Sequence, residues 1–418
     1  MRRAAESKRS FRHFSLAGIF FQGGVAAVDS NTVVPALVHG LTGSAVAVGA
    51  AVGTVRFGWL FPQLFVAYCA QRRAQRLPFY MLGAFGRVAC LAGVAALLGV
   101  AGSEPGLLVV IAFFVLWTVY SFVSGIVAVP YNDIVARSIP SAERSRMLAL
   151  RFFGGGLLAL AVAGTAHRIL QALSFPGGYG ALLALGAALL LISALFFVTA
   201  GEPAAPAEPS PAAGFRKFLR RGIDILVQDR RFRLFLAAQW LGGTAAMALP
   251  FYILQTQRSA LEVAFLLGAQ TAGALLSNPL WGWWGDRRGK RELLQTTAAA
   301  GIAAPLLALA WIAADGRWAA AALPYFALVF ALLGAVGNGS TIAYLGYLME
   351  ISPDDRRPAY SGYFNALAAP AALFPLAGGA VAQAGSFAAV FALSAAAAVL
   401  QFLTVWRLRN DESVAKAA

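Results

Sequence analysis

Apolar stretches of about 20 residues recur along the whole chain, and they constrain its fold more than any other feature. A stretch of this length crosses a bilayer as an α-helix, because a helix satisfies its own backbone hydrogen bonds. Runs such as ALLALGAALLLISALFFV lack the two-residue alternation of barrel strands. The sequence therefore predicts an all-α membrane protein with twelve transmembrane helices. The expected spans are residues 14–38, 44–70, 78–101, 106–136, 147–172, 179–200, 232–255, 260–284, 292–313, 319–349, 358–383 and 386–407.

The composition agrees with a membrane protein. Charged residues make up only 12% of the 418 residues and hydrophobic residues 59%, whereas soluble domains carry about 25% charged residues. The first apolar span is too long for a cleaved signal peptide, contains Asp29, and has no small-residue cleavage site after it. We therefore expect this span to remain in the mature chain, which would begin near Met1.

The basic residues explain the net charge of +15 without a nucleic-acid partner. Of the 33 Lys and Arg, 28 fall in the amino terminus, in alternate connections and in the carboxyl tail, and the intervening connections hold three. This alternation follows the positive-inside rule. It predicts a multi-pass protein of the cytoplasmic (inner) membrane with both termini in the cytoplasm. The basic stretches are residues 1–13, 71–77, 137–151, 215–233, 287–291, 356–357 and 407–416.

Residues 201–231 divide the predicted spans six and six. The segment opens with GEPAAPAEPSPAAG, typical of an extended, solvated linker. It continues with apolar residues at helical spacing between basic ones, which predicts an amphipathic helix on the anionic inner leaflet; a partner-binding helix is the alternative. We expect bundles at 1–200 and 232–407, and a cytoplasmic tail at 408–418.

The two halves repeat each other. AYCAQRRAQR, from Ala67, aligns without gaps with GWWGDRRGKR, from Gly282, at an offset of 215 residues. YNDIVARSIPSAER, from Tyr131, aligns with YLGYLMEISPDDRR, from Tyr344, at an offset of 213. Two six-helix halves with matching loops indicate an internal duplication, a construction common in secondary transporters.

The loop WGWWGDRRGKR contains three tryptophans followed closely by four basic residues. We expect Trp281, Trp283 and Trp284 to lie at the headgroup zone, which suits amphipathic rings. Its pattern, Gly282-x3-Asp286-Arg287-x-Gly289-Lys290-Arg291, resembles the loop signature of the major facilitator superfamily. With the duplication and the basic central loop, the resemblance extends over essentially the whole chain.

The resemblance implies two six-helix bundles with a central pathway and alternating access. The first copy of the loop departs from the family's pattern, because Ala67, Gln71 and Ala74 replace a glycine, an aspartate and a second glycine. The departure puts an inner-gate lock in the first half in doubt. The stretches 58–67 and 129–155 are similar to a little-characterised bacterial branch of the superfamily, which suggests no substrate.

Two charged residues fall inside predicted helices at similar depth, Asp29 in the first and Arg56 in the second. An ionised side chain in a bilayer is costly unless it is paired or hydrated. We expect Asp29 to be a proton-coupling or cation-sensing carboxylate, with Arg56 as its partner or as a substrate anchor. A static pair that fixes the two helices is the alternative. Arg87, in the third helix, is expected to pair with a neighbouring helix or to snorkel inward rather than to contact substrate.

Further candidates fall into two groups. Neutral polar residues mark expected walls of the pathway, although each could instead serve only an interhelical hydrogen bond. The candidates of this group are Asn31, Tyr120, Gln239, Gln270, Asn338, Tyr344 and Asn365. The expected cytoplasmic gate loops contain Arg72, Asp133, Gly282, Asp286, Arg287, Gly289, Arg291 and Glu350. In the closed gate Asp133 and Glu350 would pair with Arg72 and Arg287, or they serve as purely structural pairs.

No metal-binding or nucleotide-binding motif appears in the sequence, and we expect no cofactor and no catalytic activity. The prediction is a monomeric secondary active transporter of a small solute, with the proton as coupling ion and with export slightly favoured over import. The lipid bilayer is its expected partner, and nucleic acid is not. A transport-inactive sensor of the same fold and a polytopic membrane enzyme are the alternatives.

Overall fold

The computed structural model describes residues 2–70, 73, 75–102, 105–139, 141–203, 214–256, 259–315, 317, 319–351 and 357–417. Within these residues the secondary structure is helical and contains no strand. Eleven helices are long and apolar enough to cross a membrane. Their bounds lie close to the predicted spans, so the all-α fold expected from the sequence is confirmed. The spans are Ala45–Val66, Leu77–Val100, Leu107–Ser138, Leu150–Ala172, Gly177–Ala200, Arg230–Gln255, Leu261–Arg287, Lys290–Ala313, Ala322–Leu348, Gly362–Ala384 and Phe387–Leu408.

The first predicted span is not one continuous helix, because a turn interrupts it. It consists of α1 (Arg2–Ala27) and α2 (Val33–Thr42), with a turn between them that contains Asp29. At 10 residues α2 is too short to cross a bilayer alone. The predicted twelfth crossing by α1 and α2 together stays a prediction.

Contacts between Cα atoms divide the chain into two units. The first unit comprises Met1–Gly43, Thr54–Ala212 and Arg258–Gly268, and the second comprises Ser44–Gly53, Ala213–Gln257 and Ala269–Ala418. The main boundary falls within the linker predicted at 201–231. Two helices are divided between the units. The first residues of α3 (Ala45–Ala70) belong to the second unit, and the first residues of α11 (Ala260–Arg287) belong to the first.

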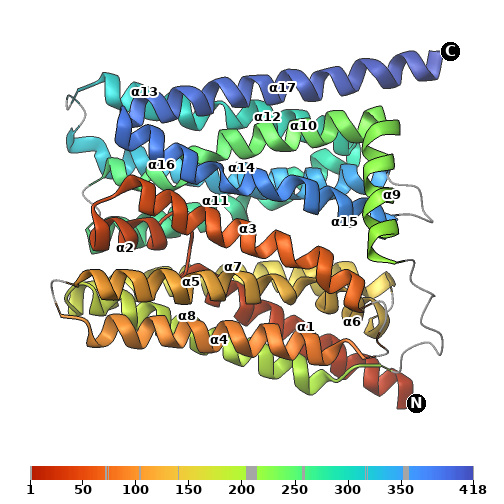
Figure 1. Ribbon diagram of the computed structural model, residues 1–418, viewed down its shortest axis with the longest axis horizontal. Coiled ribbons are helices and arrows are strands. Elements are labelled where there is room, and N and C mark those ends of the chain that lie inside the picture. The colour runs from red at the N-terminus through yellow and green to blue at the C-terminus, as the bar shows by residue number, and fades with distance from the viewer. Residues whose placement is uncertain are drawn as a thin grey trace. The chain divides into compact units, whose positions relative to one another are not determined.

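In the first unit, α1 packs along α7 and α8, and α4 packs along α5 and α8 (Figure 1). At one end of this bundle Phe14, Tyr80, Ile134 and Phe197 form a buried core, with the Tyr80 and Phe197 rings stacked at 3.9 Å between centroids. The additional helices of this unit are α4 (Leu77–Val100), α5 (Leu107–Ile126), α6 (Ala128–Ser138), α7 (Ser141–Ala172) and α8 (Gly177–Ala200).

In the second unit, α10 and α12 pack along α17, and α12 also packs along α14. The amphipathic segment forms α9, which runs across the ends of α10 and α15 (Figure 1). The elements are α9 (Phe215–Gln228), α10 (Arg230–Ala245), η1 (Ala246–Phe251), η2 (Ile253–Gln255), α12 (Lys290–Gly301), α13 (Ala303–Ala313), η3 (Ala319–Ala321), α14 (Ala322–Ile351), α15 (Arg357–Ala368), η4 (Ala369–Leu373), α16 (Phe374–Ala384) and α17 (Phe387–Ala417).

The start of α3 belongs to the second unit because small residues let it approach α16 closely. A Cβ atom on Gly49 would lie 2.1 Å from the Pro375 carbonyl oxygen, and one on Gly379 would lie 2.4 Å from the Ala45 carbonyl oxygen. The Ser44 hydroxyl donates a hydrogen bond of 2.8 Å to Oε1 of Gln383. Close backbone approach at small residues is the usual basis of helix packing in membranes.

Glycine also brings α11 and α14 together, and this contact gives a test of the second unit. A Cβ atom on Gly334 would lie 1.9 Å from the Gln270 carbonyl oxygen, whereas a Cβ atom on Gly337 of the same helix would meet nothing within 4 Å. We expect Gly334→Val to destabilise the detergent-purified protein by about 1–3 kcal/mol through overpacking. Gly337→Val should cost less than about 1 kcal/mol. Equal losses of thermal unfolding midpoint in the two variants would contradict this packing.

Candidate functional site

The break between α1 and α2 is organised by the side chain of Asp29. Its Oδ1 atom accepts hydrogen bonds of 2.9 Å from the backbone N–H of Asn31, the backbone N–H of Thr32 and the Thr32 hydroxyl. Aspartate favours such turns because its short carboxylate reaches backbone N–H groups two or three residues ahead. The side chain that was predicted to titrate therefore also stabilises the turn between the end of α1 and the start of α2.

Asp29 lies close enough to Arg56 for its negative charge to favour the charged form of the arginine. Arg56 lies on α3, in the part of that helix that belongs to the first unit, and its side chain is half-buried. The interaction joins the turn after α1 to the middle of α3. These two groups were selected from sequence depth alone, and a functional pair between them stays a prediction.

The two neutral candidates of the first unit have different surroundings. Asn31 lies in the Asp29 turn, where its backbone N–H bonds the carboxylate. Tyr120 is buried in α5, and its ring stacks on Trp117 at 5.0 Å between centroids. Its electrostatic neighbour is Arg87. Asn31 thus adjoins the candidate pair, whereas Tyr120 faces a second cationic region of the bundle.

Asp133 pairs within a cluster of charges at the ends of α4, α6 and α8. Its Oδ2 atom lies 3.4 Å from Nε of Arg76 and 2.7 Å from Nη2 of Arg137. Arg72, the partner expected from the sequence, lies outside the described residues. The Asp133–Arg72 contact of a closed gate therefore stays a prediction.

Glu202 completes this cluster, and sequence reasoning missed it. Its carboxylate bonds Arg137 and accepts hydrogen bonds from the backbone N–H groups of Arg76 (2.9 Å) and Leu77 (2.8 Å). The carboxylate therefore bonds N–H groups at the amino end of α4, where such donors lack helical partners. The prediction of a solvated segment from 201 onward is wrong at this residue, because the side chain is only 8% exposed.

The signature loop of the second unit makes a short turn between α11 and α12. Gly289 has φ 87°, in the left-handed region that favours glycine. Asp286 forms an ion pair of 3.3 Å with Lys290. Gly282, one helical turn before Asp286, would accept a Cβ atom without contact. The motif thus builds a compact turn in which Lys290 at the start of α12 pairs with Asp286 near the end of α11.

The basic residues of this loop lie against its indoles. The guanidinium carbon of Arg287 is 5.3 Å from the Trp283 ring centroid, and that of Arg288 is 5.5 Å from the Trp284 ring centroid. Arg287 forms no ion pair within the described part of the chain. Arg291 is half-buried and Glu350 exposed, and each takes part in further interactions. The Glu350–Arg287 gate contact stays a prediction.

One of the three indoles was placed incorrectly from the sequence. Trp281 is buried in the core of the second unit, and its Nε1–H donates a 2.8 Å hydrogen bond to the Ala335 carbonyl oxygen. Gly339 makes room for it, since a Cβ atom there would lie 2.7 Å from the ring. Trp283, by contrast, is 47% exposed. Only part of the tryptophan cluster therefore has the exposure expected at an interface.

Two polar candidates of the second unit, Asn338 and Tyr344, bond polar side chains on other helices. Nδ2 of Asn338 donates to Oδ1 of Asn278 at 2.6 Å, and Nε2 of Gln401 donates to the Tyr344 hydroxyl at 2.9 Å. The other candidates are half-buried on α10, α11 and α15. These are Gln239, Gln270 and Asn365.

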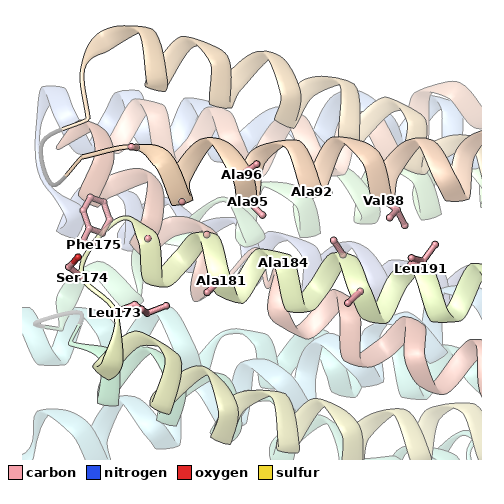
Figure 2. Close-up of a pocket in the computed structure, with 16 residues that line it drawn as sticks. Val88, Ala92, Ala95, Ala96, Leu173, Ser174, Phe175, Ala181, Ala184 and Leu191 are labelled. Carbon is pink, nitrogen blue, oxygen red and sulfur yellow. The ribbon is translucent and has the colours of Figure 1, made fainter.

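A cavity of about 810 Å³ lies in the first unit between α4 and α8, closed at one end by the turn at Ser174 and Phe175 (Figure 2). Its walls are mainly alanine and glycine, with Val88 and Leu191 at the other end. None of the candidate residues predicted from the sequence lines it. The cavity is therefore separate from the charged groups described above.

Glu202 gives a pH-dependent test of the ion cluster. Burial alone raises the pKa of its carboxyl, but hydrogen bonds from Arg137 and from the backbone of Arg76 and Leu77 lower it below the ordinary value overall. A lowered pKa means that the carboxylate stabilises the fold above about pH 4.3 and that this stability is lost as pH falls through the lower value. Glu202→Gln should cost about 1–3 kcal/mol at pH 7.

The thermal midpoints of Glu202→Gln and wild type should converge as pH falls. Glu143→Gln, at an exposed position at the start of α7, serves as the control and should follow wild type at every pH. A constant difference between Glu202→Gln and wild type from pH 7 to pH 3 would contradict the role of this carboxylate.

The fold and part of the sequence match known proteins. Residues 234–418 match the sequence model of the Major Facilitator Superfamily. No curated protein matches the sequence. Among solved structures, that of the nucleoside transporter NupG superposes with a TM-score of 0.68 at 14% identity, covering 96% of this chain and 98% of that one.

Two further structures cover almost the full length. A POT family transporter in complex with a thioalcohol-conjugated peptide gives a TM-score of 0.73 at 10% identity, covering 96% of each chain. The xylose transporter XylE from E. coli gives 0.65 at 15% identity, covering 94% of this chain and 99% of that one. The sequence match over residues 234–418 and the shared fold confirm the predicted resemblance: the chain is a membrane protein with the fold of the major facilitator superfamily.

Proposed function

We propose that the chain is a secondary active transporter that moves a small solute across the cytoplasmic membrane by alternating access, coupled to protons, with export slightly favoured over import. The observation that carries this proposal is the Asp29 carboxylate in a helix break, with Arg56 in electrostatic interaction. Discontinuous helices are typical of binding sites in transporters, where freed backbone groups and half-helix ends face solute or ions. Nucleosides, peptides and xylose, the solutes named for the similar structures, point to no single substrate class.

The internal repeat supports a specific role for Asp29. The second unit has a corresponding break, where α10 ends at Ala245 and a 3-10 segment follows. At the 215-residue offset of the loops, Asp29 corresponds to Thr244, whose hydroxyl bonds the Trp240 carbonyl oxygen at 3.0 Å. Both breaks form, although only the first has a carboxylate. A carboxylate is therefore not needed to break such a helix, which favours a function beyond shape.

Protonation of Asp29 supplies a coupling mechanism. The ionised carboxylate attracts Arg56 and accepts the N–H groups of Asn31 and Thr32. A proton on the carboxylate removes the attraction and leaves Arg56 available to an anionic group of the solute. Such a change in charge biases a two-state protein when the two states bind the proton with different affinity.

Replacing Asp29 tests this mechanism. Asp29→Asn keeps the size of the side chain and one oxygen that can accept the hydrogen bonds of the turn, but it cannot ionise. In proteoliposomes loaded with a solute selected by a pH-dependent thermal-shift screen of metabolites, amino acids, sugars and drugs, we expect proton-driven flux to fall at least about tenfold. Solute exchange without a pH gradient should be less affected, because the binding groups remain.

The control is Asp224→Asn, at an exposed position on α9, which should transport like wild type. Unchanged pH-dependent flux in Asp29→Asn would remove Asp29 from the mechanism and leave the static helix pair. The same assay distinguishes the other readings of the chain. A sensor would bind solute without flux, and a membrane enzyme would alter the solute chemically.

A second test concerns orientation. We propose that both termini and the loop at Arg288 are cytoplasmic, following the positive-inside rule. In a chain with Cys69 and Cys90 replaced, Ser174→Cys should react with a membrane-impermeant maleimide in intact cells. Arg288→Cys, 60% exposed in the wild-type fold, should react only after permeabilisation. Labelling of Arg288→Cys from outside intact cells would reverse the proposed topology.

The amphipathic helix α9 fits a position at the inner leaflet. Ile225 and Leu226 pack against the core of the second unit. Ile223 and Val227 are 59% and 66% exposed, which leaves apolar surface on the same helix for lipid. This arrangement supports the predicted membrane-surface role of the segment between the bundles.

A further inference from the structure

Two arginines in the first unit lie against one aromatic ring. The guanidinium carbon of Arg87 is 5.0 Å from the centroid of the Phe21 ring, and that of Arg151 is 5.4 Å from the same centroid. Each is ten residues after the start of its helix, α4 or α7, about 15 Å along the axis. Two positive charges therefore occupy one region inside the bundle.

Within the described residues, no acidic side chain compensates these charges. Neither arginine forms an ion pair within the described part of the chain. Arg87 is only 2% exposed, and its electrostatic neighbours are Tyr80, Tyr120 and the like-charged Arg151. The Nε atoms of both guanidinium groups are buried without a hydrogen-bond partner in the described fold.

The charged cluster at Asp133 and Glu202 differs from this region because its arginine has carboxylate partners. Arg137 bonds both Asp133 and Glu202. A buried cation is normally retained with such a carboxylate partner, because taking it from water is otherwise costly. Aromatic rings attract a cation through their faces but do not neutralise it. Among the residues that the structure describes, the two arginines at Phe21 therefore have no carboxylate partner.

The position of Arg151 is built into the packing of α1 and α7. A Cβ atom on Gly18 would lie 2.3 Å from Cγ of Arg151, so the glycine provides the space for the arginine stem. Nη1 of Arg151 donates a 2.6 Å hydrogen bond to the Tyr131 hydroxyl, and its guanidinium carbon lies 5.0 Å from the Tyr131 ring centroid. Arg151 is half-buried, so it can meet a ligand that enters from outside the bundle.

We propose that Arg87 and Arg151 form an oxyanion-binding site that accepts a carboxylate or phosphate group. Guanidinium groups suit such ligands because their N–H donors match pairs of oxygen atoms. Arg151 makes the direct contact, and Arg87 supplies a second positive charge from the far interior. The bound anion neutralises two charges that otherwise repel each other in a medium of low dielectric constant. The site is separate from the Asp29–Arg56 pair and does not require that the chain transport solute.

Binding to the purified, delipidated protein in neutral detergent tests the site. Inorganic phosphate is titrated calorimetrically at constant ionic strength maintained with chloride, and thermal midpoints are recorded in parallel. A second arm replaces phosphate with micellar phosphatidylglycerol, with phosphatidylcholine as its neutral match. Saturable binding and a raised midpoint are expected in at least one arm. The phosphate arm reports a soluble anion, and the lipid arm reports a headgroup.

The variants are Arg87→Met and Arg151→Met, with Arg168→Met as the control because Arg168 is an exposed arginine on the same helix, α7. Each of the first two should weaken the binding about tenfold or more, and the control should bind like wild type. Without ligand, Arg87→Met should be at least as stable as wild type, because one of two repelling charges is gone. Arg151→Lys keeps the charge and should retain part of the affinity.

The wild-type titration alone decides the proposal if a variant fails to fold. Absence of saturable binding in both arms would overturn it. Binding that persists unchanged in Arg87→Met and Arg151→Met, or that Arg168→Met weakens equally, would also overturn it. A loss of stability in Arg87→Met without ligand, combined with unchanged anion binding, would assign Arg87 to helix packing only.

Discussion

The cost of a charge inside the bilayer governs the placement of the polar groups in this chain. Apolar helices provide the spans, and they need nothing beyond length and mutual packing. Each charged side chain within them requires a partner, a turn or water. Within the described residues of the first unit, Asp29 and Arg56 and also Arg87 and Arg151 lie inside the helices, whereas Asp133 and Glu202 meet their arginines at the helix ends. These arrangements differ in how far partners satisfy each charge, and this difference distinguishes structural groups from candidate functional groups.

In the cluster at the ends of α4, α6 and α8 the charges satisfy one another. Glu202 bonds Arg137 and two N–H groups, so removing it leaves donors without an acceptor. Asp29 has a different balance, since its oxygen is held by its own turn while its charge acts on Arg56. A proton can therefore change the interaction with Arg56 while the turn keeps its backbone contacts. That separation suits a coupling group better than a static pair.

The spans were predictable because length and hydropathy are local properties. Depth along helices that run in opposite directions predicts that Asp29 and Arg56 lie in one region, and their functional pairing stays a prediction. Glu202 could not be found this way, because its partners are 65 and 126 residues away and its neighbours resemble a linker. Trp281 was misplaced because sequence cannot distinguish an indole at the interface from one covered by a facing helix. Arg151 was counted with the loop cations, although it lies ten residues into α7.

The two halves share the break in their first helix but differ in the side chains at corresponding positions. Both have a break in their first helix, but the first half has Asp29 where the second has Thr244 at the 215-residue offset. In the second unit the polar contacts Asn278–Asn338 and Tyr344–Gln401 are neutral and satisfy each other. Neutral pairs hold helices together over a wide range of pH, whereas the first unit concentrates groups whose interactions depend on a proton or an anion. Sensitivity to ions would therefore arise in the first unit, whereas the interhelical contacts Asn278–Asn338 and Tyr344–Gln401 of the second unit are neutral.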